Sequence, residues 1–243
     1  MNDQPVIQRI LKEIDNGPKI YVDIGCSYES NLPNEIINQG NKTLFFELDK
    51  QKIASWKSSE NFKIINEKVT PINVFDLIYK EIPQNSDITY LDIDIDGYDF
   101  QVLESLLARV RPYLIVAEIN EKIPPPIKFS VKYDENYFWN SSHFYGMSLS
   151  KFNELADKYE YDLIDLTANN IYAIRKDKNE KFKKFSVEEI YNEKYKNPRL
   201  NGFLPQFYYN SNFDDVMNMQ SEDAIKFINQ FFAEYKDKYE LYI

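Results

Sequence analysis

Short apolar runs alternate with amphipathic segments through the first half of the chain. Five of the runs have the near-continuous Ile, Leu, Val, Phe and Tyr content of strands buried on both faces, at residues 19–24, 43–47, 62–66, 88–94 and 113–119. Segments with apolar residues at helical spacing lie before and between them, at residues 6–14, 32–38, 74–79 and 100–110, and after Asp49. Such repeated strand–helix units predict an α/β fold with a mostly parallel sheet and helices on both faces.

The pattern changes after residue 120. Residues 121–147 contain three consecutive prolines and many aromatic residues without a clear period, which favours a lid or substrate loop. A helical pattern follows at 152–159. Two strand-like runs, 162–166 and 171–175, then come so close together that they can pair only antiparallel.

The last quarter of the chain has a different character. A charged stretch at 176–184 is typical of a solvated connector, and residues 186–189 have the pattern of a capping box. Apolar residues at helical spacing from Ile225 to Tyr239 predict a terminal amphipathic helix. We therefore expect a domain over 1–180, which includes the lid, and a helical appendage over 181–243 that packs on the sheet domain or on a second copy of the chain.

Composition narrows the class of protein. The chain has 243 residues, of which 43% are apolar, so a large core is possible. The net charge of -10 disfavours nucleic acid as a partner, because phosphate binding needs clustered Lys and Arg. The single cysteine, Cys26, allows no disulfide within the chain. The first residues lack the features of a leader peptide, and no apolar run is long enough to cross a bilayer. We expect a cytoplasmic protein with no membrane partner.

Carboxylates gather at the end of the fourth predicted strand. The run 88–94 carries Asp92 and Asp94, and Asp96 follows just before Gly97. A buried carboxylate without a partner is strongly unfavourable, so these side chains are expected to have a function there. Ligands of open α/β sheets bind outside the carboxyl ends of the strands. The segment therefore marks the expected edge of an active site.

The first two strands also end in polar residues. Asp23 precedes Gly25, a glycine that lets the backbone turn tightly and approach a ligand closely. Glu47 ends the second strand, where a carboxylate can accept hydrogen bonds from ribose hydroxyls. A dinucleotide site is poorly supported, because Gly25 lacks the further glycines that bind a pyrophosphate. The alternative roles are a helix cap for Asp23 and an ordinary polar strand end for Glu47.

These residues resemble a known family. Asp23-Ile-Gly25, Glu47, the segment Asp94-Ile-Asp-Gly-Tyr-Asp99 and the final antiparallel hairpin are similar to class I S-adenosylmethionine-dependent methyltransferases, in particular the FkbM-like and sugar O-methyltransferase branch. The resemblance covers about residues 15–175 and implies a Rossmann-like, seven-stranded, mostly parallel sheet with a C-terminal antiparallel hairpin. One departure is that residues 26–29 stand where such enzymes usually carry further glycines.

The resemblance also implies which residues bind the cofactor: Asp23, Gly25, Cys26, Ser27, Glu47, Leu48, Glu67, Lys68 and Asp94. Asp23 would contact the methionine end of S-adenosylmethionine, Glu47 the ribose, and Leu48 the adenine. Asp94 would lie near the methionine amino group or beside a metal ion. Together Asp23, Glu47 and Asp94 are expected to line one edge of the sheet.

Catalysis on an alcohol acceptor needs a group that removes its proton. His143 is the only histidine and lies in the expected lid, so it is a candidate base, with a packed or surface histidine as the alternative. Glu118 ends the fifth strand, and with the sheet order that the resemblance implies it would lie beside Asp94, where two such close carboxylates share a proton or bind a cation. Asp94, Asp96 and Glu118 are therefore candidate ligands for magnesium or manganese, with structural ion pairs as the alternative.

The expected function is methyl transfer from S-adenosylmethionine to oxygen of a small polar acceptor. The resemblance points to a sugar, a nucleotide-linked sugar or another building block of a surface polysaccharide. His143, Asp94 and Glu118 are the candidate catalytic residues. Two alternatives are a nicotinamide-dependent oxidoreductase on a related sheet and a non-catalytic assembly protein that keeps the fold. The C-terminal helices are the expected contact in a homo-oligomer.

Overall fold

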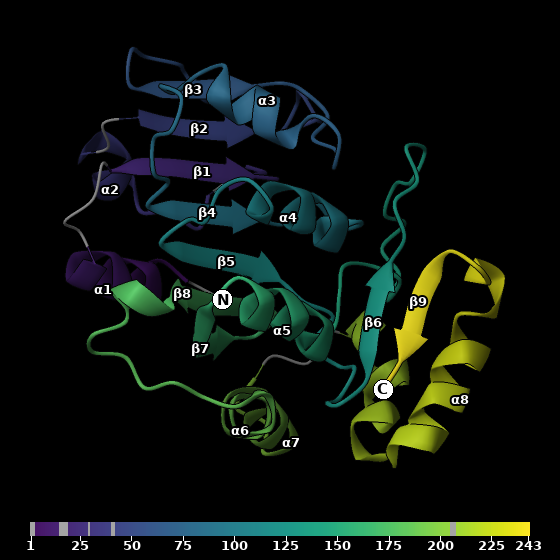
Figure 1. The fold of residues 1–243 in the computed structure, drawn as a ribbon. Helices are drawn as coiled ribbons and strands as arrows, with labels where there is room; N and C mark the ends of the chain where they lie inside the picture. Colours follow the sequence, from purple (N-terminus) through teal and green to yellow (C-terminus); the bar gives the residue numbers. More distant parts are fainter. Residues whose placement is uncertain (1–2, 15–18, 29, 40–41, 205–207) are drawn as a thin grey trace.

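A seven-stranded sheet forms the centre of the molecule (Figure 1). The computed structural model describes residues 3–14, 19–28, 30–39, 42–204 and 208–243. The strand order is β3-β2-β1-β4-β5-β8-β7, and β8 alone runs antiparallel to its neighbours in this sheet. The strands are β1 (Ile20–Ile24), β2 (Lys42–Phe46), β3 (Phe62–Ile65), β4 (Tyr90–Ile93), β5 (Leu114–Glu118), β7 (Tyr161–Thr167) and β8 (Asn170–Arg175). The predicted fold class is confirmed.

Helices cover both faces of this sheet. One face packs against α1 (Gln4–Ile14) and α2 (Asn34–Gln39). The other face packs against three helices, which are α3 (Val74–Tyr79), α4 (Asp99–Leu107) and α5 (Leu149–Lys158). The burial of apolar side chains on both faces explains why the strand sequences are almost continuously apolar.

The two-residue period of a strand decides which side chains reach the edge of the sheet. In β1, Tyr21 belongs to the core under α1 and α2, whereas Val22 and Ile24 belong to the core under α3 to α5. Asp23 therefore points to the same side as Tyr21. It pairs in register with Asp92 of β4, so two carboxylates lie side by side on the α1/α2 face.

A second, two-stranded sheet lies beyond the carboxyl edge of the first (Figure 1). It joins β6 (Lys128–Val131) to β9 (Tyr239–Tyr242) in antiparallel register. The remaining elements are a 3-10 turn (Lys176–Lys178), α6 (Val187–Ile190), a π-helical segment (Tyr191–Lys196), α7 (Asn197–Leu200), a 3-10 segment (Tyr208–Asn218), α8 (Ser221–Phe231) and a second 3-10 turn (Ala233–Tyr235). The capping box predicted at residues 186–189 is present at the start of α6.

Three local features differ from the sequence pattern. The segment after Asp49 forms turns instead of a helix, although the Asp49 side chain accepts the N–H of Gln51 and its carbonyl oxygen accepts the N–H of Lys52. The helix expected to reach Tyr239 ends at Phe231. Residues 121–147, expected to form an irregular loop, contain the strand β6. Its partner β9 lies more than a hundred residues later in the sequence, so no local pattern predicts the pairing.

The contact between residues 120–147 and residues 190–242, here called the lid–appendage interface, is well packed. Phe144 stacks on Tyr235 with ring centroids 4.0 Å apart, and it also contacts Phe129 and Phe232. The interface also contains charged contacts, since Lys122 forms an ion pair with Asp214 although the Lys122 side chain is almost completely buried. The appendage is thus held to the rest of the chain by both apolar and charged contacts.

No helix among the described residues has the length and apolar character that a bilayer span requires.

Candidate active site at the carboxyl edge of the sheet

A cavity of about 560 Å³ opens where the first four strands end. Its walls come from the segments that follow β1, β2, β3 and β4, and from the lid. The lining residues are Ile24, Gly25, Ser27, Phe46, Glu47, Leu48, Asp49, Lys52, Glu67, Lys68, Val69, Asp94, Ile95, Asp96, Tyr98, Tyr137, Phe138 and Trp139. The volume lies within the usual range for cofactor and small-molecule sites.

Gly25 lines the cavity at the point where the chain leaves β1. Its φ is +94°, and a Cβ atom there would lie 1.7 Å from the carbonyl oxygen of Asp94. Its N–H donates to the carbonyl oxygen of Phe46 at 2.8 Å. Only glycine therefore allows the chain to leave β1 so close to the end of β4.

Glu47 organises the loops that follow β1 and β2. Its carboxylate accepts the N–H of Ser27 at 3.0 Å and the N–H of Asp49 at 2.8 Å. Asn66 fixes the same loop by donating to the carbonyl oxygens of Glu47 and Leu48, both at 2.8 Å. Each carboxylate oxygen keeps a lone pair for a further donor, so Glu47 can still bind a hydroxyl in the cavity.

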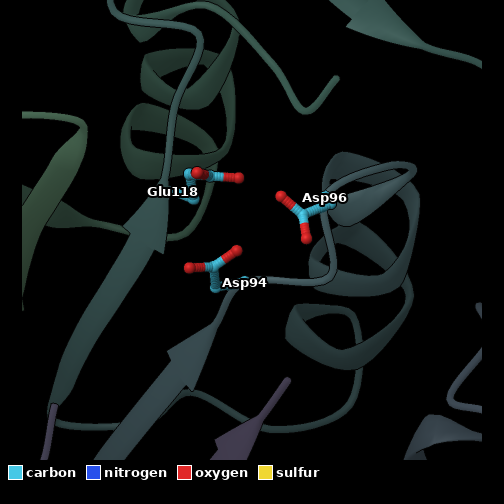
Figure 2. Close-up of side chains that lie close together, drawn as sticks. All are labelled: Asp94, Asp96 and Glu118. Atoms are coloured by element: carbon cyan, nitrogen blue, oxygen red, sulfur yellow. The ribbon is translucent and has the colours of Figure 1, made fainter. Parts of the chain in front are cut away.

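Three carboxylates meet at the ends of β4 and β5. Figure 2 shows Asp94, Asp96 and Glu118 pointing toward one another. One oxygen from each lies within 4.8 Å of the oxygens of the other two. This juxtaposition follows from the parallel pairing of β4 with β5, which agrees with the sheet order that the family resemblance implies.

Neighbouring side chains hold these carboxylates in place. The amide of Asn169, in the β7–β8 turn, donates to Glu118 Oε1 at 2.7 Å. The carboxylate of Asp99 accepts the N–H groups of Ile95 and Gly97, at 2.8 and 2.9 Å, and so closes the turn that carries Asp96. The φ of Asp96 is +55°.

Burial and mutual repulsion disfavour ionisation of this group. Burial first, and then the negative charges around them, raise the pKa of Asp94 and of Glu118 well above the ordinary range. Burial also raises the pKa of Asp96, although the nearby charge of Lys52 opposes the shift. The site is therefore suited to bind positive charge or a proton.

The lid closes over the cavity from two sides. The ring of Tyr137 packs against the turn after β4, where a Cβ on Gly97 would come within 2.8 Å of it. On the opposite side, the Lys68 ammonium lies 4.9 Å from the centroid of the Phe138 ring and donates to the carbonyl oxygen of Glu135. Residues 135–138 thus bridge the segments that follow β3 and β4.

Most of the predicted cofactor residues do line this cavity: Gly25, Ser27, Glu47, Leu48, Glu67, Lys68 and Asp94. Asp23 and Cys26 do not. Asp23 is buried on the α1/α2 face and accepts a hydrogen bond from Ser30, and Cys26 packs in the same core. The expected gathering of Asp23, Glu47 and Asp94 thus holds for two of the three.

His143 lies elsewhere, within the lid–appendage interface. Its ring stacks on Phe213 with centroids 5.0 Å apart, and Nε2 lies 3.0 Å from Asn212 Oδ1. It is buried and is not among the residues that line the cavity. The structure therefore places the ring in a packed position, which was the alternative to its role as a base.

Sequence reasoning did not identify three side chains that shape the site. Lys52 and Asp49 line the cavity beyond β2, and Asn169 orients Glu118. Asn169 could have been found, because a hairpin that places β8 beside β5 also brings its turn to the end of β5. The positions of Lys52 and Asp49 depend on an irregular loop that has no sequence period.

Comparison with known proteins adds a family assignment. The family model described as methyltransferase FkbM domain matches residues 13–155, which is more than half of the chain. No curated protein sequence matches the chain.

Several solved structures are similar to parts of this chain at low identity. The methyltransferase domain of bacterial CtHen1 has a TM-score of 0.42 at 12% identity, with 71% of this chain and 96% of that chain covered. Magnesium protoporphyrin IX methyltransferase from Synechocystis PCC 6803, with bound SAM, has a TM-score of 0.42 at 7% identity and coverage of 71% and 79%. A SAM-dependent methyltransferase from Aquifex aeolicus has a TM-score of 0.38 at 12% identity and coverage of 69% and 88%. Likeness at this level says nothing about the substrate of this chain.

Proposed function

The chain belongs to the FkbM family of methyltransferases, and on that premise we propose that it methylates an oxygen atom of a small polar acceptor, with S-adenosylmethionine as the methyl donor. The observation that carries the proposal is the cavity at the carboxyl ends of β1 to β4, with Glu47 on one wall and Asp94 on the other. Family membership supports the reaction class, and the lining of the cavity supports the choice of residues.

The donor fits the cavity by its chemistry. The two ribose hydroxyls of S-adenosylmethionine match the lone pairs that Glu47 keeps after binding two backbone N–H groups. Leu48 and Val69 supply apolar surface for the adenine ring. The sulfonium and amino groups carry positive charge, which Asp94 and Asp96 attract.

Methyl transfer is a displacement at carbon. The acceptor oxygen forms a bond to the methyl carbon, the carbon–sulfur bond breaks with its electron pair going to sulfur, and the sulfonium becomes a neutral thioether. The acceptor hydroxyl must also lose its proton, and a carboxylate with a raised pKa is a suitable base near neutral pH. Asp94 lines the cavity and is the proposed base, and the carboxylate of Glu118 lies close to it.

The acceptor that we propose is a sugar, a nucleotide-linked sugar or a related polysaccharide building block. Phe138 and Trp139 present partly exposed rings at the cavity, and such rings stack on sugar faces. Carboxylates nearby can accept hydrogen bonds from several hydroxyls. His143 is not needed in this scheme.

Calorimetry with the whole chain tests the donor. We expect S-adenosylhomocysteine to bind with one-to-one stoichiometry and NAD to give no binding heat. Binding of NAD in place of S-adenosylhomocysteine would favour the oxidoreductase alternative. A chain that binds neither nucleotide would favour the assembly protein, and either result would refute the proposal.

A further inference from the structure

The three carboxylates at the ends of β4 and β5 form an arrangement that methyl transfer alone does not require. We propose that Asp94, Asp96 and Glu118 bind one divalent cation of the magnesium or manganese type, which presents open coordination positions to the cavity. The cation site is argued from these side chains themselves. Its use in binding the acceptor rests on the proposed function.

The spacing of the carboxylates suits a single ion. One oxygen from each residue lies within 4.8 Å of the other two. Two ligand oxygens on opposite sides of an ion are separated by twice the metal–oxygen distance, or about 4.2 Å for Mg²⁺ and up to about 5 Å for Ca²⁺. One cation can therefore contact all three residues with small side-chain adjustments.

An unsatisfied atom also points into the cluster. Glu118 is 93% buried, as only 7% of its surface is exposed, and its Oε2 atom has no hydrogen-bond partner among the described residues. Its carboxylate is directed toward Asp94 and Asp96 (Figure 2). A buried carboxylate oxygen without a donor is costly, and a bound cation would remove that cost.

The cluster has little positive charge around it. Within the part of the chain that the structure describes, none of the three carboxylates forms an ion pair. Lys52 and Lys68 are the cations among the lining residues. A proton shared between Asp94 and Glu118 is the competing way to satisfy the cluster.

The ligands are already oriented for binding. Asn169 donates to Oε1 of Glu118, and the Glu118 carboxylate lies toward those of Asp94 and Asp96 (Figure 2). Partners of this kind, which orient a ligand without touching the metal, commonly change metal affinity by about 10–100-fold. Asn169 carries no charge, so its substitution tests orientation separately from electrostatics.

Three carboxylates do not complete an octahedral shell, so magnesium or manganese would keep further positions for water or substrate. Asp94 and Asp96 line the cavity, which places those positions on the acceptor side. An acceptor with two neighbouring oxygens, such as a vicinal diol, could then displace two waters, and the cation would lower the pKa of the bound hydroxyl.

Binding of Mn²⁺ to the whole chain, without donor or acceptor, tests the site. Electron paramagnetic resonance should show one bound ion per chain. We expect Glu118→Gln and Asp96→Asn each to weaken binding by about tenfold or more, and Asn169→Ala by about tenfold. Glu104→Gln, an exposed position on α4, should leave Mn²⁺ affinity unchanged. Water proton relaxation should be enhanced by the bound ion, because it retains exchangeable water.

The proposal is overturned if the wild type binds no Mn²⁺, or if Glu118→Gln and Asp96→Asn bind it as well as the wild type does. Thermal unfolding identifies any variant that fails to fold, and the Mn²⁺ affinities of the folded variants then test the cation site. Calorimetry with S-adenosylhomocysteine is independent of this experiment. A wild-type chain that binds S-adenosylhomocysteine but no Mn²⁺ contradicts the cation site alone, whereas a wild-type chain that binds Mn²⁺ but no S-adenosylhomocysteine contradicts the proposed function alone.

Discussion

The carboxylate cluster and the lid–appendage interface both contain carboxylates, but these carboxylates have cationic partners only at the interface. At the interface, Lys122 pairs with Asp214, and Arg199 donates to that same carboxylate at 3.0 and 3.2 Å. At the cluster, Asp94 and Glu118 face each other without an opposite charge. Paired buried charges are typical of structural sites, whereas unpaired ones concentrate where a ligand or a reaction completes them.

This difference makes a general prediction. Neutralising a charge in the cluster should reduce activity and leave stability unchanged or improved. Neutralising a charge at the interface should reduce stability and leave the chemistry of the folded enzyme unchanged. The substitutions that follow test this contrast.

Asp94→Asn should have the largest effect. Loss of a positioned base and of one charge near the sulfonium is expected to lower kcat by about 10²–10⁴-fold. The midpoint of thermal unfolding should stay the same or rise, because one of several mutually repelling carboxylates is removed. Steady-state kinetics and calorimetric unfolding measure the two effects on the same preparation.

Asp76→Asn is the matched control for Asp94→Asn. Asp76, on α3, makes an exposed ion pair of 3.7 Å with Arg109, which follows α4, and neither residue lines the cavity. It should behave as the wild type in both measurements. An Asp94→Asn enzyme with more than half of the wild-type kcat would remove Asp94 from the catalytic scheme.

Lys122→Met should mainly affect stability. The change leaves Asp214 paired with Arg199 and is expected to lower the free energy of unfolding by about 2–3 kcal/mol. Urea unfolding measures this loss. Lys226→Met removes an exposed pair with Asp223 and should cost less than about 0.5 kcal/mol. If the two variants were equally stable, the interface charges would not be structural.

Substitution of His143 tests whether the lid–appendage interface also contributes to methyl transfer. We expect His143→Ala to lower the free energy of unfolding by about 1–3 kcal/mol, through lost packing on Phe213 and a lost partner for Asn212. The pH profile of kcat should keep its shape. His143→Gln should recover part of the stability. Loss of one limb of the pH profile in a stably folded His143→Ala enzyme would restore histidine as the base.

The strand pattern was sufficient to predict a mostly parallel sheet with polar residues at the ends of its strands. Glu47 was found in the same way. The neighbouring position of β4 and β5, and with it the meeting of Asp94 with Glu118, was expected from the sheet order that the family resemblance implies. Gly25 was also identified correctly, since its φ and its approach to Asp94 permit no other residue.

The predictions that placed residues wrongly or incompletely depended on distant contacts. Whether Asp23 reaches the cavity depends on which side of β1 it faces, and a strand with apolar residues on both sides does not reveal that. His143 was judged from its polar and aromatic neighbours, but its environment comes from Phe213 and Phe231 in the appendage. The pairing of β6 with β9 also joins segments that are far apart in the sequence.

Asp23 and Asp92 predict how stability depends on pH. Burial is the largest cause that raises the pKa of Asp23 well above its ordinary value of 3.8, and burial raises that of Asp92 to about 6. A raised folded-state pKa contributes stability that is full below the unfolded pKa and is lost as the pH rises through the folded pKa. The free energy of unfolding, measured in chelator, should therefore be about 1–2 kcal/mol larger at pH 5.5 than at pH 8.

Asp23→Asn should weaken this dependence on pH, because the amide cannot ionise and its oxygen can still accept from Ser30. The same variant should bind S-adenosylhomocysteine within about threefold of the wild type, a difference below 1 kcal/mol. A larger loss of affinity would return Asp23 to the cofactor site. An unchanged pH dependence would assign the effect to other carboxylates.

Lys68→Ala should have the smallest effect, and it tests the lid where the two regions meet. Lys68 holds the lid through the ring of Phe138 and the carbonyl oxygen of Glu135, on the exposed side of the cavity. An exposed cation–π contact is worth about 0.5–1 kcal/mol, so the Kd for S-adenosylhomocysteine should rise by about two- to fivefold while kcat changes little. Calorimetry and kinetics separate these quantities, with Lys63→Ala on β3 as the control. A change in kcat without a change in Kd would mean that Lys68 acts on the reacting groups and not through the lid. The contacts of Lys68 with the lid would then affect the reaction itself, as the carboxylate cluster is expected to do.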